Sequence, residues 1–417
     1  MNEIRRDLYL KQLIQRRENG AIKVITGVRR CGKSFLLFHL YKSYLLEEGI
    51  DQSQILEIPL DDDDYEELRE RKNLSRYIKE HTDSAKTYFV FLDEVQFCDG
   101  FESVLNGISR KENLDIYVTG SNSKFLSSDI LTEFRGRGDE VRVFPLSFAE
   151  FVSAFDGDKS DAWREYMMYG GMPRVLFCNS DEQKAKYLSD LFQNVYIKDV
   201  VERNHLKDEN ILSDVVNVLA SSIGSLTNAN KLANSFQSSG IKTNDKTVSA
   251  YIAHLSDAFL IQKAERYNVR GRKYISSPVK YYFTDVGLRN ARLNFRQYEP
   301  THIMENIVYN ELIIRGYNVD VGVVEKYYRD DSGKQKIALL EIDFVCNKGS
   351  NRYYIQSVYS LPDEDKIKQE MASLDRVDDS FKKIVVVADN IKPWHNEKGY
   401  LIINVIDFLL NENSLEQ

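Results

Sequence analysis

The sequence predicts an α/β protein of several domains, the first of which is built on a parallel sheet. Two observations lead to this expectation. The chain has 417 residues, which is enough for two to four domains with separate cores. Its first third also alternates short apolar strands with helical patterns, and polar residues follow the strands. The 42% apolar and 29% charged residues are typical of a globular protein.

The first element is an apolar strand at 22–26, followed by a glycine-containing loop and a helix at 35–45. The loop reads GVRRCGKS and fits G-x-x-x-x-G-K-[ST] at every fixed position. Backbone N–H groups of such a loop surround phosphates, its lysine reaches the β and γ phosphates, and its hydroxyl binds Mg²⁺. We therefore expect a nucleoside triphosphate with Mg²⁺. The expected contacts are Gly27, Val28, Arg29, Arg30, Cys31, Gly32, Lys33 and Ser34.

A second buried strand, at 88–92, ends in a pair of carboxylates. We expect Asp93 to hold Mg²⁺ through water, together with the hydroxyl of Ser34. We expect Glu94 to polarise the attacking water. A carboxylate pair at this position favours hydrolysis of the nucleotide over binding alone.

The next strand reads NLDIYVT and ends in polar residues that can sense the γ-phosphate. Of these, Asn122 is the expected sensor in preference to Ser121. The loop that follows carries Arg135 and Arg137, which are placed to reach the nucleotide of a neighbouring subunit. The alternative is that either arginine pairs with local carboxylates.

The middle of the chain contains two segments with different secondary-structure patterns. Residues 151–204 have a mostly helical pattern, which predicts a lid over the nucleotide. After His205 come three helices and two strand-like runs, which together predict a winged helix-turn-helix. The hairpin of this motif is rich in basic residues and tyrosine, as contact with a phosphate backbone requires. A solvated subunit contact is the alternative. The candidate DNA-binding residues are Arg266, Arg270, Arg272, Lys273 and Lys280.

Residues 1 to about 205 resemble the AAA-type ATPases of a large bacterial and archaeal group. The motifs GVRRCGKS, FLDEVQ, TGSNS, FRGR, PLSFAEF and GGMP occur in that order. The resemblance implies ATP as the nucleotide, a parallel sheet with a helical lid, and assembly into a ring or partial ring. Cys31 lies inside the first motif, either as an oxidation-sensitive thiol or as a small tolerated residue.

The C-terminal third resembles the restriction-endonuclease-like domains found at the same place in this group. The resemblance places Glu305 at the helical acid and Asp343 at the central aspartate. Gln356 then occupies the position of the second carboxylate and Val358 that of the lysine. Because an amide is a poor ligand for Mg²⁺, we expect this site to be catalytically inactive. Cleavage would require a substitute such as Lys348 or Lys366.

The predicted fold is thus a P-loop AAA-type parallel sheet with a helical lid, then a winged helix-turn-helix, then a restriction-endonuclease-like α/β domain. The expected boundaries are 1–145, 146–205, 206–290 and 291–417. We expect a cytoplasmic ATPase without a membrane segment that couples hydrolysis to DNA binding or remodelling, with branched DNA as one substrate, and that forms a homo-oligomer. A nucleotide-dependent regulatory switch with protein partners and an ATP-dependent nuclease are the alternatives.

Overall fold

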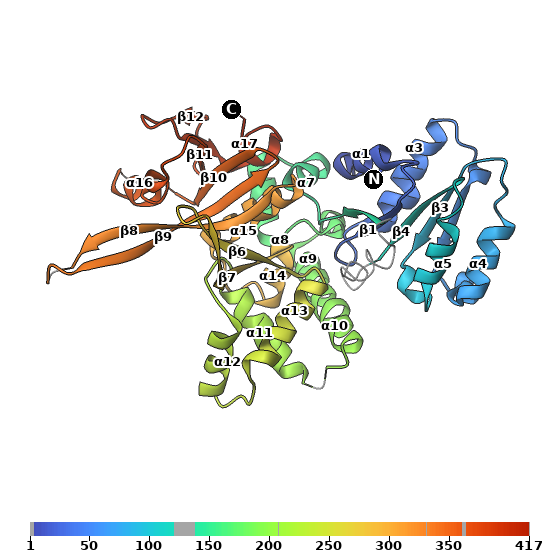
Figure 1. Cartoon of the computed structure of the whole chain (residues 1–417), viewed down its shortest axis with the longest axis horizontal. Helices are drawn as coiled ribbons and strands as arrows, with labels where there is room; N and C mark the ends of the chain where they lie inside the picture. The colour runs from blue at the N-terminus through green and yellow to red at the C-terminus, as the bar shows by residue number, and fades with distance from the viewer. Residues whose placement is uncertain (1–3, 121–137, 207, 331, 361–363, 417) are drawn as a thin grey trace. The chain divides into compact units, whose positions relative to one another are not determined.

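The structure is a computed structural model that describes residues 4–120, 138–206, 208–330, 332–360 and 364–416 (Figure 1). The chain divides into two compact units. The first consists of Met1–Pro145 with Asp257–Phe259, and the second of Leu146–Ser256 with Leu260–Gln417. Each unit contains its own sheet.

The sheet of the first unit is parallel and has the strand order β2-β3-β4-β1-β5. Three of its strands are buried along their whole length, as expected of a parallel sheet with both faces covered. The parallel sheet predicted for the N-terminal part is therefore confirmed. The strands are β1 (Ile22–Thr26), β2 (Ile55–Pro59), β3 (Tyr88–Asp93), β4 (Leu114–Thr119) and β5 (Gly138–Arg142).

Helices cover the two faces of this sheet. On one face the apolar side chains of α4 and α5 pack with those of the strands in a single cluster. On the other face Tyr41, in the long helix that follows the phosphate loop, packs on Phe91 and Tyr117. The helical segments are α1 (Asp7–Arg16), α2 (Lys33–Phe35), η1 (Leu36–Tyr41), α3 (Lys42–Glu47), η2 (Gln52–Gln54), η3 (Asp63–Arg69), α4 (Arg71–Glu80), η4 (Val95–Phe97) and α5 (Phe101–Ile108).

The second unit begins with a run of helices. The segment predicted as a lid forms the first of them, and within this unit α8 and α9 pack against α14. Three further helices precede the basic hairpin, in the order predicted for a winged helix, and that assignment stays a prediction. The helices are α7 (Phe148–Ala154), α8 (Lys159–Tyr169), η6 (Pro173–Phe177), α9 (Asp181–Asp190), η7 (Leu191–Ile197), α10 (Lys198–Arg203), α11 (Glu209–Ser221), α12 (Ala229–Ser238), α13 (Asp245–Asp257), α14 (Val286–Arg292), α15 (Pro300–Ile314), α16 (Glu364–Met371), η8 (Leu374–Arg376) and α17 (Val405–Leu410).

The sheet of the second unit is mixed and has the order β12-β13-β11-β10-β9-β8-β6-β7. The basic hairpin β6–β7 joins it because β6 pairs in parallel with β8. Strands from both sides of the boundary expected at residue 290 therefore belong to one sheet. The strands are β6 (Ile261–Asn268), β7 (Lys273–Phe283), β8 (Asn318–Arg329), β9 (Gln335–Lys348), β10 (Asn351–Val358), β11 (Lys382–Val387), β12 (Trp394–His395) and β13 (Leu401–Asn404).

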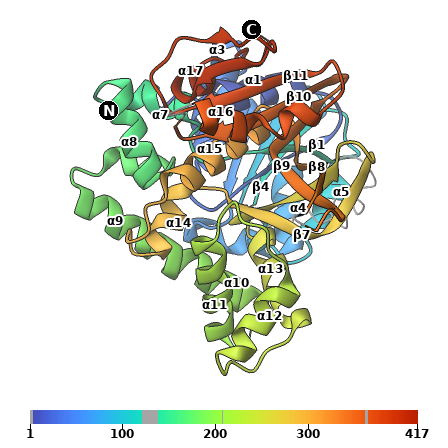
Figure 2. The same ribbon diagram turned by 90° about the vertical axis from the view of Figure 1, so that its left-hand side faces the viewer.

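Two features of this sheet bear on function. Helix α15 packs across β7, β8, β9 and β10, so a side chain on its inner face meets several strands. In addition, β8 and β9 continue past the other strands as a two-stranded arm (Figure 1), and Figure 2 shows the ribbon from the side on which this arm points toward the viewer. The nuclease-like identity of this region stays a prediction.

Candidate functional site

The loop between β1 and α2 depends on its glycines for its shape. Gly27 has φ 135° and Gly32 has φ 101°, which side chains rarely tolerate. A Cβ atom on Gly27 would lie 2.0 Å from the carbonyl oxygen of Val143. The spacing of the two glycines in the motif therefore has a steric cause.

Lys33 follows the second glycine and directs its buried ammonium back into the loop. Its Nζ atom donates to the carbonyl oxygens of Gly27 and Val28, each at 3.1 Å. Neutral carbonyls compensate a full positive charge only partly, so an anion inside the loop would be a stronger partner. The residues present therefore fit the phosphates of a nucleotide.

The two residues expected to hold Mg²⁺ contact each other. Asp93, at the end of β3, is hydrogen-bonded to the hydroxyl of Ser34 and accepts a hydrogen bond from the hydroxyl of Thr119, at the end of β4. Burial raises the pKa of Asp93, so a bound cation would stabilise its charged form. A hydroxyl and a carboxylate oxygen that adjoin are suitable ligands for Mg²⁺.

Glu94 lies beside this pair in a left-handed backbone conformation, with φ 46°. Its backbone N–H donates to the Thr119 hydroxyl at 3.0 Å, and the amide of Gln96 donates to its carboxylate. The side chain is buried. Backbone strain at a buried carboxylate is common at functional sites, and it supports the role predicted for Glu94.

Arg6 is a residue of this site that the sequence analysis missed. Its guanidinium donates to the carbonyl oxygen of Cys31 at 2.9 Å and to that of Phe144 at 2.6 Å. It also stacks on Tyr9 and is buried. Arg6 thereby ties the phosphate loop to the segment after β5. One arginine before a helix carries no sequence pattern that would have shown this.

Two other predictions about this unit have definite outcomes. Cys31 is fully buried, its Sγ donates to the carbonyl of Val143 at 3.4 Å, and burial raises the pKa of its thiol. This favours the tolerated packing residue over the reactive thiol. The predicted sensor and arginine-finger residues, Asn122, Arg135 and Arg137, lie outside the described residues.

The predicted DNA-binding cations fall into two groups. Arg270 and Arg272 are exposed in the turn between β6 and β7, and Lys273 is exposed at the start of β7. The prediction is wrong for Arg266 and Lys280, which are 7% and 4% exposed, because their side chains lie inside the second unit. Strand alternation accounts for the error, since a hairpin on one sheet buries part of its basic residues.

Lys280 lies among acidic side chains instead of at the surface. Its Nζ atom is 2.8 Å from Glu305 on α15 and 2.7 Å from Glu341 on β9. It is 4.0 Å from Asp343, also on β9. The structure therefore brings together the two predicted acids, Glu305 and Asp343, and supplies a lysine that the sequence motif lacks.

The other predicted positions of the degenerate nuclease site differ in their surroundings. The Gln356 side chain accepts a hydrogen bond of 3.4 Å from the backbone N–H of Asp343. Val358 belongs to a hydrophobic cluster with Tyr354, so it is a packing residue. Lys348 donates to the carbonyl of Arg315 at 2.7 Å and is engaged elsewhere. The side chain of Lys366 lies outside the described residues.

The comparison with known proteins agrees with this geometry. An uncharacterized protein of Haemophilus influenzae is 34% identical over 413 residues, which make up 98% of each chain. The chain belongs to the same family as this protein. Uncharacterized protein MJ1544 of Methanocaldococcus jannaschii is 27% identical over 424 residues, which cover 97% of this chain and 88% of the relative.

Two segments match described families. Residues 19–152 match an AAA domain, and residues 160–299 match a domain of unknown function (DUF8612). Among solved structures, the Walker-type ATPase PABY2304 of Pyrococcus abyssi is similar in fold, with a TM-score of 0.50 and 16% identity. That likeness covers 70% of this chain and 96% of the other. The first unit is thus a P-loop ATPase domain of the AAA type, as predicted.

In the part of the chain that the structure describes, no helix is both long and apolar enough to cross a membrane.

Proposed function

We propose that this chain binds ATP with Mg²⁺ and hydrolyses it, and that it couples hydrolysis to DNA binding. The observation that supports the enzymatic part most strongly is the convergence of Lys33, Ser34 and Asp93 at the ends of β1 and β3. Lys33 and Ser34 come from the phosphate-loop motif and Asp93 from the motif at the end of β3, and each has the chemistry that a nucleotide with Mg²⁺ requires.

Each of these side chains would have a separate role in the reaction. Lys33 would exchange the carbonyls of Gly27 and Val28 for the β and γ phosphates. Ser34 and Asp93 would hold Mg²⁺, which neutralises charge on the phosphates. Glu94, next to Asp93, would orient a water molecule for attack on the γ-phosphate.

Nucleotide binding and turnover can be tested separately. Lys33→Ala removes the ammonium that binds the phosphates, so we expect ATP affinity to fall by more than about tenfold. Glu48→Ala, which alters an exposed residue of the same unit, is the matched control and should leave affinity unchanged. Unaltered affinity in Lys33→Ala would refute the nucleotide site. Isothermal calorimetry with a slowly hydrolysed ATP analogue and Mg²⁺ provides the measurement.

Two basic surfaces support the DNA part of the proposal. The first is formed by Arg270 and Arg272 in the exposed turn of the second unit and by Lys273 at the start of β7, and Tyr327 is exposed on the arm of the same sheet. Cations on an exposed turn can follow a phosphate backbone, and an exposed tyrosine can stack on an unpaired base.

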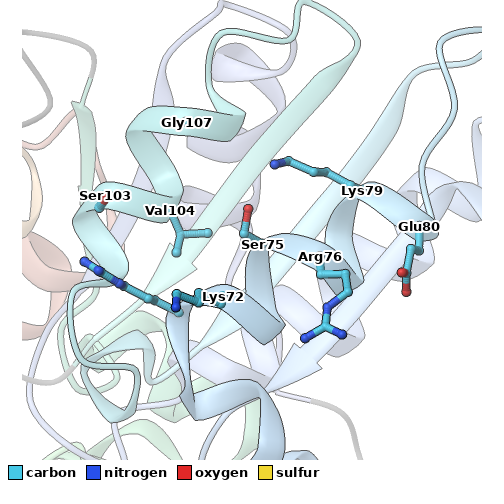
Figure 3. A pocket seen from close by; sticks show the side chains of 9 residues that line it. Lys72, Ser75, Arg76, Lys79, Glu80, Ser103, Val104 and Gly107 are labelled. Carbon is cyan, nitrogen blue, oxygen red and sulfur yellow. The ribbon is translucent and has the colours of Figure 1, made fainter.

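The second surface is an open hollow between α4 and α5 of the first unit. Figure 3 shows the side chains of α4 along one side, with Ser103, Val104 and Gly107 of α5 on the other. Lys72 and Lys79 are separated by about 10 Å along α4, a distance that corresponds to about three base-pair steps along a DNA helix axis. Four cations line this hollow, and the side chain of Glu80 is the one carboxylate beside them. Among the described residues, none of the four cations forms an ion pair. The cations are Arg71, Lys72, Arg76 and Lys79.

DNA binding can be tested by fluorescence anisotropy with duplex, single-stranded and four-way DNA, with and without ATP. Replacing the three turn cations by alanine should weaken binding and reduce the salt slope by about 0.9 for each lost phosphate contact. The control removes three exposed cations from the far end of the chain, as Arg376→Ala, Lys392→Ala and Lys398→Ala. Equal effects in the two triple variants would refute the turn as a DNA contact.

A regulatory switch with a protein partner is the second candidate, and one observation favours it. On the arm formed by β8 and β9, Tyr327 pairs with Ile337, and Leu339 lies two residues along on the same face. These three apolar side chains are 49%, 54% and 55% exposed. An apolar stripe on a projecting ribbon suits a protein surface better than a phosphate backbone. If the chain binds no DNA but its arm binds a protein, this second candidate replaces the first.

The proposed homo-oligomer rests on the resemblance to ring-forming ATPases and on the arginines predicted to act between subunits. Sedimentation velocity with and without ATP tests it. We expect ATP to increase the sedimentation coefficient, and Arg135→Ala with Arg137→Ala to reduce turnover while ATP binding persists. A monomer under all conditions would contradict assembly.

A further inference from the structure

The buried charge cluster around Lys280 is a second site, which the nucleotide chemistry does not use. Its members come from three elements that are far apart in the sequence: Lys280 from β7, Glu305 from α15, and Glu341 with Asp343 from β9. The side chain of Lys280 is 4% exposed and that of Glu305 is 7% exposed. Glu341, at 32%, is the carboxylate that solvent reaches.

Hydrogen bonds hold the acids in place. The Tyr282 hydroxyl donates to Glu305 at 2.6 Å, next to the 2.8 Å contact from Lys280. The backbone N–H of Ser357 donates to Asp343 at 2.8 Å. Each of the two buried carboxylates therefore has a fixed orientation, and the ammonium lies between them and Glu341.

The surroundings of the two buried acids shift their pKa values in opposite directions. Burial alone would raise the pKa of Glu305, but the Lys280 ammonium, the nearby His302 ring and the hydrogen bond from Tyr282 hold it low, at about 2. Burial raises the pKa of Asp343 well above its usual range, and the neighbouring charge of Glu305 adds to the effect. The surroundings of the two acids therefore favour the charged form of Glu305 more strongly than that of Asp343.

The same geometry leaves no position for a metal ion. Among the described residues, no group of three His, Cys, Asp or Glu side chains is arranged to hold one. The space between the acids, where a divalent ion would lie, contains the Lys280 ammonium. The hydroxyl of Ser357, whose backbone N–H donates to Asp343, is buried and has no hydrogen-bond partner among the described residues.

We propose that the Lys280 ammonium is the permanent cation of this site, in the position that a divalent ion would take, and that removing it leaves a cage that binds such an ion. The native second unit then has no metal-dependent chemistry, because its cation cannot dissociate and cannot activate water. Mn²⁺ suits the cage because carboxylate oxygens are hard ligands. The proposal does not depend on the nucleotide site.

Mn²⁺ binding to nucleotide-free protein tests this directly, by electron paramagnetic resonance of free Mn²⁺. All variants also carry Ser34→Ala, which removes the predicted Mg²⁺ ligand of the phosphate loop. We expect no stoichiometric binding when Lys280 is present. We expect one Mn²⁺ per chain in Lys280→Ala, with affinity at least about tenfold above the parent, and loss of this binding in Lys280→Ala with Asp343→Asn.

The melting temperature is a second measurement, and it also tests the proposal if the Lys280→Ala protein folds poorly. Mn²⁺ should raise the melting temperature of Lys280→Ala and leave that of the parent unchanged, since only the variant has a vacant cage. Stoichiometric binding by the parent that Asp343→Asn abolishes would overturn the proposal. So would a Lys280→Ala protein that neither binds Mn²⁺ nor gains stability from it.

Discussion

The Oδ2 atom of Asp285 accepts a hydrogen bond of 2.7 Å from the backbone N–H of Gly171. Asp285 also caps α14 through a hydrogen bond of 2.9 Å from the backbone N–H of Leu288. This carboxylate therefore joins the GGMP segment after α8 to the start of α14, inside the second unit. The pair accounts for a motif that the sequence analysis could use only as a family marker.

Asp285 gives the protein a pH-dependent stability. Burial raises its pKa to about 6, although three backbone N–H groups oppose the shift. Between pH 4 and pH 6 the folded chain holds a proton that the unfolded chain has released, so stability falls as pH rises. The shift corresponds to about 3 kcal/mol. Urea unfolding should show wild type losing about this much more stability than Asp285→Asn between pH 4 and pH 7. Parallel pH profiles of the two proteins would contradict the assignment.

Close backbone contact at Gly287 predicts a large steric effect. A Cβ atom at this position would lie 1.9 Å from the carbonyl oxygen of Tyr169 and 2.9 Å from the backbone nitrogen of Gly170. We therefore expect Gly287→Ala to destabilise the second unit by more than about 3 kcal/mol in urea unfolding. Gly240→Ala is the control, because it has a positive φ of 84° but nothing within 4 Å, and it should cost about 1 kcal/mol. Similar costs would show that the contact at Gly287 relaxes.

Arg6 should affect nucleotide binding without touching the nucleotide. Arg6→Ala leaves the carbonyls of Cys31 and Phe144 without their donors, and each such loss costs about 1–3 kcal/mol. We expect a lower melting temperature and weaker ATP binding from a less ordered loop. Arg5→Ala, at a side chain that is 76% exposed, should change neither. Unchanged ATP affinity in Arg6→Ala would restrict Arg6 to a role in stability.

The ion pair of Lys280 and Glu305 predicts strong coupling between the two residues. Lys280→Met leaves Glu305 buried without a counter-charge, which costs about 3–5 kcal/mol. Glu305→Gln in the same chain should recover most of that loss, because a neutral pair has no desolvation penalty to offset. Lys326→Met, at an exposed residue of the arm, should change stability by less than about 0.5 kcal/mol. Additive effects of the two cluster substitutions in urea unfolding would contradict the pairing.

Local patterns were sufficient to predict the first unit. The phosphate loop and the acids after β3 are contiguous motifs whose chemistry depends on nearby backbone, so the sequence shows them directly. The parallel sheet followed from buried strands such as 88–92, which are apolar along their whole length. Arg6 was missed because its partners, the carbonyls of Cys31 and Phe144, are 25 and 138 residues away.

Long-range pairing explains what the sequence could not show in the second unit. Pairing of β6 with β8 brings the predicted hairpin into the C-terminal sheet, and this carries Lys280 to Glu305 and Asp343. The local strand motif therefore contains no lysine at the expected position, since the ammonium comes from Lys280 on another strand. The same pairing buries Arg266, which had been expected to contact DNA.

The rate of ATP hydrolysis by Glu94→Gln, measured beside its ATP affinity, tests the central claim most directly. Glutamine keeps the size of the side chain but cannot orient water as a base, so turnover should fall by more than about a hundredfold. Affinity for ATP with Mg²⁺ should stay within about threefold of wild type, because Lys33, Ser34 and Asp93 are intact. Wild-type turnover in Glu94→Gln, or wild-type protein that binds ATP without hydrolysing it, would contradict the proposed ATPase mechanism.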